Sequence, residues 1–228
     1  MNELENLFFQ YTGHKPNQIT EFAASGSKRK YFRLENEHEV LIGVKGTSVE
    51  ENKAFITMAQ HFVNKSLPVP RVLAQSDDGQ YYLQEDLGNT TLFDFIAQGR
   101  KTGVFSVEEK KMLRKTLQLL PSFQVKGAEG FDFSVCYPHP DFNERTILWD
   151  LNYFKYCFLK ATGLDFQENK LEDDFQHFTK VLMSVPANTF MYRDFQTRNV
   201  MIKEEQPYFI DFQGGRRGPL HYDIASFL

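Results

Sequence analysis

Little in this sequence suits a disulfide framework, a metal cluster or a membrane span. Its 228 residues include two cysteines, Cys136 and Cys157, and neither these nor the six histidines have the spacing of metal ligands. No apolar run is long enough to cross a bilayer. A secretory leader would open with basic residues, whereas this chain opens with MNELENLFFQ. These absences predict a cytoplasmic protein with no membrane contact.

Basic residues are neither in excess nor clustered. The 26 lysines and arginines are outnumbered by 30 acidic residues, and the basic run at residues 28–30 is short. A nucleic-acid partner is therefore not expected, because it would require a phosphate-binding footprint of positive charge. The 41% apolar and 25% charged residues are typical of a globular protein. A chain of this length can bury a good core as one domain or as two small lobes.

The most informative segment is YRDFQTRN at residues 192–199, followed by YFIDFQ at residues 208–213. Asp194 could accept a hydroxyl proton, while Asn199 and Asp211 could hold Mg²⁺ against the phosphates of a nucleotide. Both side chains offer the hard oxygen ligands that Mg²⁺ prefers. The alternative is an ordinary turn between strands, where Asp and Asn are common. The apolar strand that precedes Asp211 favours phosphoryl transfer.

The first third of the chain has the pattern of strands around one helix. Strands are expected at residues 19–22, 30–34, 40–45, 71–75 and 80–85, with a hairpin turn at 76–79. Ser48 is expected to cap the helix that follows the third strand, and Glu51 to complete a capping box. Apolar residues then recur at helical spacing as far as residue 63.

Helical patterns dominate the remainder of the chain. They are expected at residues 92–98, 107–124, 143–161 and 171–183, ahead of a strand pair that carries the opening motif. This order predicts an α+β fold in two lobes, as in the protein kinases. Residues 1–88 would form a nucleotide-binding lobe with an antiparallel sheet, residues 85–89 a hinge, and residues 89–228 a mostly helical lobe.

Two segments of the first lobe could contact nucleotide phosphates. Ser25, Gly26 and Ser27 lie between the first two strands, where small residues let backbone N–H groups approach phosphates; an isolated turn is the alternative. Lys45 ends the third strand and could pair with phosphates while Glu50 or Glu51 holds it in place. A solvated lysine is the alternative there, since Glu51 already has the expected capping role.

Further residues have expected positions near this site. The backbone at Glu85 and Leu87 could offer N–H and C=O groups to an adenine edge. Asp223 is expected to hydrogen-bond the backbone of the catalytic segment. Arg198 could contact a phosphate or form an ion pair, and the arginines at 216 and 217 could face phosphates or lie in a solvated loop.

With GPLHYDIAS at residues 218–226, these motifs resemble the aminoglycoside phosphotransferase and choline kinase superfamily. Within it the sequence looks most like the bacterial kinases that phosphorylate the anomeric hydroxyl of N-acetylmuramate and N-acetylglucosamine. Four segments fit that branch, at residues 30–34, 67–70, 85–88 and 148–159. The resemblance implies that Asp194 is the catalytic aspartate, that Asn199 and Asp211 bind Mg²⁺, and that residues 25–28 face the phosphates of ATP or, as in some relatives, GTP.

The resemblance also has departures. Tyr192 stands where the family usually has histidine, a residue used mostly for packing and backbone bonding, and the strand lysine is irregular in this branch. Family domains continue well beyond the position of Leu228, so the resemblance implies an incomplete second lobe that a further C-terminal domain or a partner would cover.

The expected function is an ATP- and Mg²⁺-dependent kinase acting on a hydroxyl of a small molecule, an amino sugar or related saccharide, with aminoglycosides as a substrate alternative. The alternative from another class is a non-catalytic nucleotide-binding or regulatory module. A protein kinase is disfavoured, because no activation segment separates Asp211 from the turn at residues 218–219.

Overall fold

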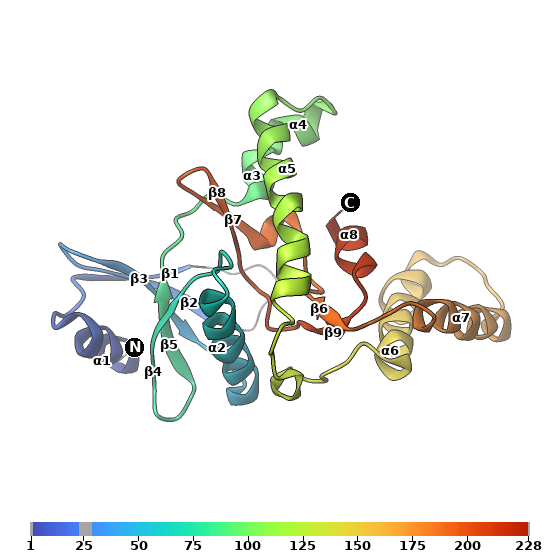
Figure 1. Cartoon of the computed structure of the whole chain (residues 1–228), viewed down its shortest axis with the longest axis horizontal. Helices are drawn as coiled ribbons and strands as arrows, with labels where there is room; N and C mark the ends of the chain where they lie inside the picture. Colours follow the sequence, from blue (N-terminus) through green and yellow to red (C-terminus); the bar gives the residue numbers. More distant parts are fainter. Residues whose placement is uncertain (1, 23–28, 228) are drawn as a thin grey trace.

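The sheet lobe contains the five expected strands, in a computed structural model that describes residues 2–22 and 29–227 (Figure 1). Its elements are α1 (Asn2–Thr12), β1 (Gln18–Phe22), β2 (Lys30–Glu35), β3 (Val40–Lys45), α2 (Val49–Asn64), β4 (Val72–Gln75) and β5 (Tyr81–Glu85). The strands form one antiparallel sheet in the order β1-β2-β3-β5-β4. The expected strands and the antiparallel sheet are confirmed.

Helix α1 was not expected, because the sequence analysis placed a single helix in the first third of the chain. Its Leu4, Leu7 and Phe8 are buried against Leu34 and Leu83 on one face of the sheet. These three apolar residues recur at helical spacing, so the signal was present but short. Helix α2 covers the opposite face (Figure 1).

Ser48 caps α2 as expected, since its hydroxyl oxygen accepts a hydrogen bond from the Glu51 N–H. The predicted capping box is wrong. The Ser48 hydroxyl donates to the Glu50 carboxylate at 2.9 Å, while the carboxylate of Glu51 pairs with Arg29. Glu51 is drawn away from the cap because a buried arginine requires a charged partner.

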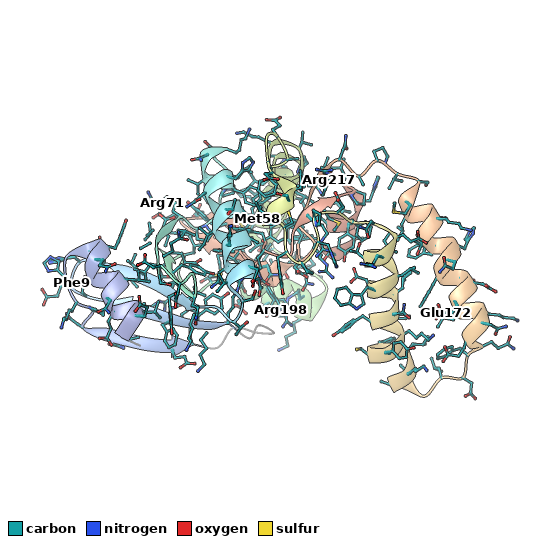
Figure 2. The ribbon with its side chains drawn as sticks, turned by 90° about the horizontal axis from the view of Figure 1, so that it is seen from below. Phe9, Met58, Arg71, Glu172, Arg198 and Arg217 are labelled. Atoms are coloured by element: carbon teal, nitrogen blue, oxygen red, sulfur yellow. The ribbon has the colours of Figure 1, made fainter. Side chains whose placement is uncertain are left out.

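The second lobe is mostly helical. Its helices are α3 (Leu92–Phe95), α4 (Ala97–Thr102), α5 (Val107–Pro121), α6 (Glu144–Phe154), α7 (Glu168–Met183) and α8 (His221–Phe227). The helix predicted at residues 92–98 is divided at Ile96, and α5 and α6 each continue into a π-helical turn, Ser122–Lys126 and Lys155–Leu159. Helices α6 and α7 pack together as a projecting hairpin, which holds Glu172 at the opposite end of the molecule from Phe9 (Figure 2). No helix within residues 2–22 and 29–227 could cross a membrane.

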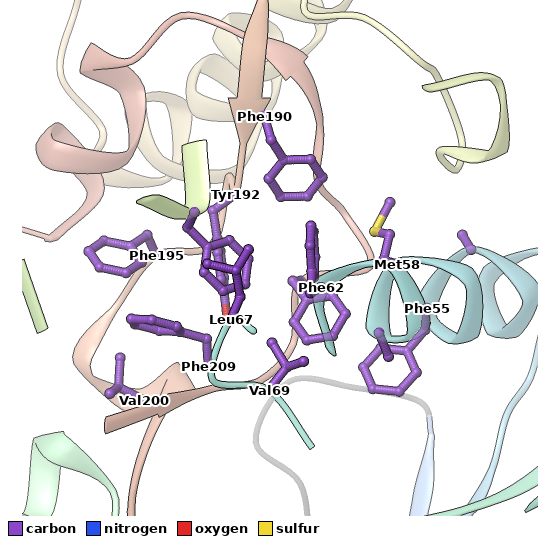
Figure 3. Packing of buried hydrophobic residues seen from close by; sticks show 14 of the residues in the cluster. Phe55, Met58, Phe62, Leu67, Val69, Phe190, Tyr192, Phe195, Val200 and Phe209 are labelled. Atoms are coloured by element: carbon purple, nitrogen blue, oxygen red, sulfur yellow. The ribbon is translucent and has the colours of Figure 1, made fainter. Parts of the chain in front are cut away.

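The segment at residues 192–199, which carries the sequence motif, lies between two short antiparallel strand pairs rather than on the single pair expected. One pair joins β6 (Thr189–Met191) to β9 (Arg216–Gly218), and the other joins β7 (Val200–Lys203) to β8 (Gln206–Phe209). Aromatic side chains fill the core between these strands and α2, with Phe62 directed toward Phe190 (Figure 3). Phe55 of α2 stacks on Phe212 with ring centres 4.9 Å apart. The core therefore ties α2 directly to the segment that carries the site.

Candidate active site

A cleft of about 320 Å³ lies between the lobes and contains two of the three motif residues. Asn199 and Asp211 line it from the helical lobe, beside Met201 and Ile210. The sheet lobe and the connecting segment contribute Phe22, Tyr31, Arg33, Ile42, Phe55 and residues 84–89. Its lining thus combines apolar side chains with polar and charged groups, among them the possible cation ligands Asn199 and Asp211. This is the usual arrangement of a site for a nucleotide-sized ligand.

The segment that carries Asp194 is fixed by buried contacts. The backbone N–H groups of Tyr192 and Arg193 donate to the carboxylate of Asp223 at 3.0 and 2.8 Å, which confirms the role expected of Asp223. The Tyr192 hydroxyl donates to the carbonyl of Ile210, so this residue packs and bonds backbone as expected. Arg193 has a φ of 76°, a conformation that is costly for a non-glycine residue and that surrounding contacts must impose.

Asn199 and Asp211 are placed by the same local network. The Asn199 side-chain amide donates to the backbone carbonyl of Asp194 at 2.8 Å, so its Oδ1 remains as the atom able to bind a cation. The Ile210 N–H donates to the Asn199 carbonyl at 3.0 Å, which brings the two strands of the motif together. Asp211 has a φ of 65° and accepts a 2.7 Å hydrogen bond from Gln213.

One carboxylate and one amide oxygen fit a Mg²⁺ ion that takes its other ligands from water and phosphate. Within the described residues, no group of three or more His, Cys, Asp or Glu side chains could hold a metal. The donor set therefore suits an ion that arrives with a nucleotide better than a permanently bound structural metal.

Burial and charge make Asp194 a stronger base than a free carboxylate. Burial raises its pKa, the negative charge of Asp211 raises it further, and Arg193 and Arg216 oppose the change. Open space beside the carboxylate depends on Gly214, where a Cβ atom would lie 3.3 Å from the Asp194 Oδ2. Burial also raises the pKa of Asp223, against the effect of its hydrogen bonds.

The segment between the lobes is held from both sides. The Asp86 carboxylate pairs with Arg33 of β2 at 2.7 Å, and Lys203 of β7 donates to the Asp86 carbonyl at 3.0 Å. The Glu85 side chain is occupied by Arg71, and its backbone N–H donates to the Arg71 carbonyl at 3.0 Å. Leu87 is buried and lines the cleft. Glu85 and Leu87 were expected from the sequence, whereas Arg33 and Asp86 were not, because their pairing joins distant segments.

Lys45 is not brought to the cleft, which corrects the predicted pairing with Glu50 or Glu51. Successive side chains on a strand point to opposite faces. Ile42 and Val44 of β3 belong to the core on the cleft side, so Lys45 is exposed, with its Nζ 5.6 Å from the Tyr81 ring centre. Ser25, Gly26 and Ser27 lie outside the described residues.

Three arginines occupy positions that the sequence did not resolve. Arg198 is exposed and lines the cleft, with its guanidinium carbon 4.1 Å from the Phe93 ring centre, so the expected phosphate contact stays a prediction. Arg216 is buried and donates to the Gly214 carbonyl, so it is not in a solvated loop. Arg29 is only 4% exposed, and its guanidinium lies 3.1 Å from the Glu51 carboxylate. Its position in a short basic run gave no sign of this burial.

Residues 18–228 match the Phosphotransferase enzyme family, which covers nearly the whole chain and includes all three motif residues. The chain belongs to this family. It is 24% identical over 214 residues to an N-acetylmuramate/N-acetylglucosamine kinase of Pseudomonas aeruginosa, covering 92% of this chain and 59% of that protein. It is 29% identical over 164 residues to the protein of that name from Neisseria meningitidis, and the match covers 70% of this chain and 46% of that protein.

The chain therefore spans about three fifths or less of the length of these family relatives. Two solved structures share its fold. One is a thermostable mutant of aminoglycoside phosphotransferase APH(4)-Ia in complex with ADP and hygromycin B. Its TM-score is 0.62 at 13% identity, and the match covers 98% of this chain and 75% of that chain. The other is a choline kinase from Cryptosporidium parvum, with a TM-score of 0.63 at 13% identity, and the match covers 92% of this chain and 62% of that chain. The two-lobed, kinase-like fold is confirmed.

Proposed function

We propose that this protein is an ATP- and Mg²⁺-dependent kinase that phosphorylates a hydroxyl group of a small molecule, with an amino sugar or related saccharide as the acceptor. The observation that carries the proposal is the hydrogen bond from the Asn199 amide to the Asp194 carbonyl, beside Asp211 at the same cleft. Together with the hydrogen bond from the Ile210 N–H to the Asn199 carbonyl, it connects the segments that carry the proposed base and the two proposed cation ligands. The names of the relatives support a saccharide acceptor.

Asp194 would orient the acceptor hydroxyl and take its proton. Its raised pKa suits this task, because a stronger carboxylate base accepts a proton more readily. The Asn199 Oδ1 and the Asp211 carboxylate would hold Mg²⁺, which when bound neutralises charge on the phosphates. Most of the rate gain would come from positioning and charge neutralisation.

The nucleotide base would occupy the apolar part of the cleft. Ile42, Met201 and Ile210 supply its walls, and the backbone at Glu85 and Leu87 would meet the base edge. The proposed phosphate donor is ATP, and GTP is the alternative donor. No nucleic acid or membrane partner is part of the proposal.

The test is phosphoryl transfer from ATP, measured with N-acetylmuramate, N-acetylglucosamine, an aminoglycoside and choline as separate acceptors. Mg²⁺-dependent turnover with a saccharide is expected, and Asp194→Asn should reduce it by about 100-fold or more. Asp141→Asn is the matched control, since this partly exposed carboxylate lies beside Arg217 and does not line the cleft. Mg²⁺-dependent ATP binding without transfer to any acceptor would instead favour the non-catalytic nucleotide-binding module.

A further inference from the structure

A phosphoryl-transfer site needs a fixed cation beside the nucleotide phosphates, and β3 does not provide one. The strand directs Ile42 and Val44 toward the core on the cleft side and Lys45 away from it. Helix α2 nevertheless presents a carboxylate on that side, because Glu51 lies in its first turn and pairs with Arg29. The Arg29 guanidinium is therefore paired with α2 on the cleft side of the sheet, whereas Lys45 points away from that side.

Arg29 is anchored on two sides. Its Nη2 lies 3.1 Å from Glu51 Oε1, and its guanidinium carbon lies 5.6 Å from the ring centre of Phe55. Phe55 itself lines the cleft and stacks on Phe212, the residue after Asp211. The guanidinium thus lies next to a ring that lines the cleft and that stacks on the residue after Asp211.

Tyr31 connects Arg29 to the metal side of the cleft. This tyrosine follows Arg29 by two residues and lines the cleft together with Asp211. Glu51, Arg29 and Tyr31 therefore connect α2 to the cleft that Asp211 also lines.

We propose that Arg29 supplies the cation that contacts the nucleotide phosphates and that Glu51 positions it, in place of a lysine on β3; this inference rests on the proposed kinase function. A guanidinium has five N–H donors in a planar fork, so one that pairs with a carboxylate can also bind phosphate oxygens. Its charge is permanent, which suits a site partly enclosed by aromatic rings. Lys45 has no part in nucleotide binding.

The experiment measures the affinity of the protein for adenosine, AMP, ADP and ATP by isothermal titration calorimetry in the presence of Mg²⁺. Arg29→Met should weaken ATP binding by about 10- to 100-fold, as expected for the loss of a charge-assisted contact, and leave adenosine binding unchanged. Arg29→Lys and Glu51→Gln should give smaller losses in the same direction, and Lys45→Met should give none. The loss should grow with the number of phosphates.

Lys155→Met is the matched control, because Lys155 is also a buried cation paired with carboxylates, Glu168 and Glu172, on the α6–α7 hairpin. It should lower the melting temperature and keep the ratio of ATP to adenosine affinity. If Arg29→Met does not fold, Arg29→Lys and Glu51→Gln carry the test.

Two results would overturn the inference while leaving the kinase proposal in place. One is wild-type ATP affinity in Arg29→Lys and Glu51→Gln together with a loss in Lys45→Met. The other is an equal loss for adenosine and ATP in the Arg29 variants, which would indicate a purely structural ion pair. Failure of the wild-type protein to bind ATP would instead overturn the kinase proposal itself.

Discussion

The side-chain amide of Asn199 donates a 2.8 Å hydrogen bond to the backbone carbonyl of Asp194. The proposed base and a proposed metal ligand are therefore held at a fixed separation, although they lie five positions apart in the chain. Asparagine suits this position because one end of its amide donates and the other accepts. Aspartate would keep the cation ligand and lose the donor.

Asn199→Asp should reduce kcat by about 10- to 100-fold, because a carboxylate facing the Asp194 carbonyl replaces a hydrogen bond with repulsion. The dependence on Mg²⁺ should persist, since an oxygen ligand is retained. Measuring kcat across a Mg²⁺ titration separates the two effects. A variant with normal kcat and weakened Mg²⁺ binding would show that the hydrogen bond to Asp194 has no role in positioning.

Asp194→Asn should abolish most activity and also stabilise the fold, by roughly 0.5–2 kcal/mol at neutral pH. The sign follows from the raised pKa of Asp194, whose usual value is 3.8. A carboxyl whose folded-state pKa is raised binds its proton more tightly in the folded protein, so its ionisation costs stability as pH rises above the unfolded value.

The gain in Asp194→Asn should therefore be small near pH 4 and grow as pH rises through the folded-state pKa of Asp194. Urea unfolding of both proteins at several pH values measures this difference. A stability difference that does not change with pH would contradict the assignment of a raised pKa to this group.

Asp223→Ala should have the opposite effect on stability. Two buried backbone N–H groups, those of Tyr192 and Arg193, would lose their acceptor, at a cost of about 1–3 kcal/mol each. The melting temperature should fall, and activity should fall further because the segment bearing Asp194 loses its support. Asp141→Asn, at a partly exposed ion pair, should change neither. Equal stability of Asp223→Ala and the wild type would show that these hydrogen bonds do not hold the segment.

Gly214→Ala should impair catalysis more than it impairs folding. The added methyl group would lie 3.3 Å from the Asp194 carboxylate, close enough to shift it but not to disturb the core. Steady-state kinetics should show kcat reduced by about 10-fold or more, the scale of a displaced catalytic group, with a melting temperature near that of the wild type. Unchanged kcat would place the acceptor hydroxyl on the other side of the carboxylate.

The sequence predicted the features that local patterns determine. The five strands, the Ser48 cap and the hydrogen-bonding role of Asp223 are confirmed, because alternation, capping residues and motif spacing act over short stretches. The orientation of Lys45 could also have been predicted from the sequence. The apolar Ile42 and Val44 mark the core-facing positions of its strand, so the lysine that follows must point away.

Arg29 and the Arg33–Asp86 pair could not be predicted in the same way. Each depends on segments brought together only by the folded sheet, with Asp86 lying 53 positions beyond Arg33. An arginine just before a strand is usually exposed, and nothing nearby in the sequence shows that α2 will bury Arg29. Long-range charge pairs need tertiary structure before they can be assigned.

The stacking of Phe55 on Phe212 has a thermodynamic consequence. Phe55 lies one helical turn after Glu51, and Phe212 directly follows Asp211, so a shift of α2 displaces the proposed cation and a proposed metal ligand together. Occupancy of one site then alters the free energy of filling the other. Linkage requires the effect to be reciprocal, so Mg²⁺ should raise the affinity for ATP by the same factor by which ATP raises the affinity for Mg²⁺.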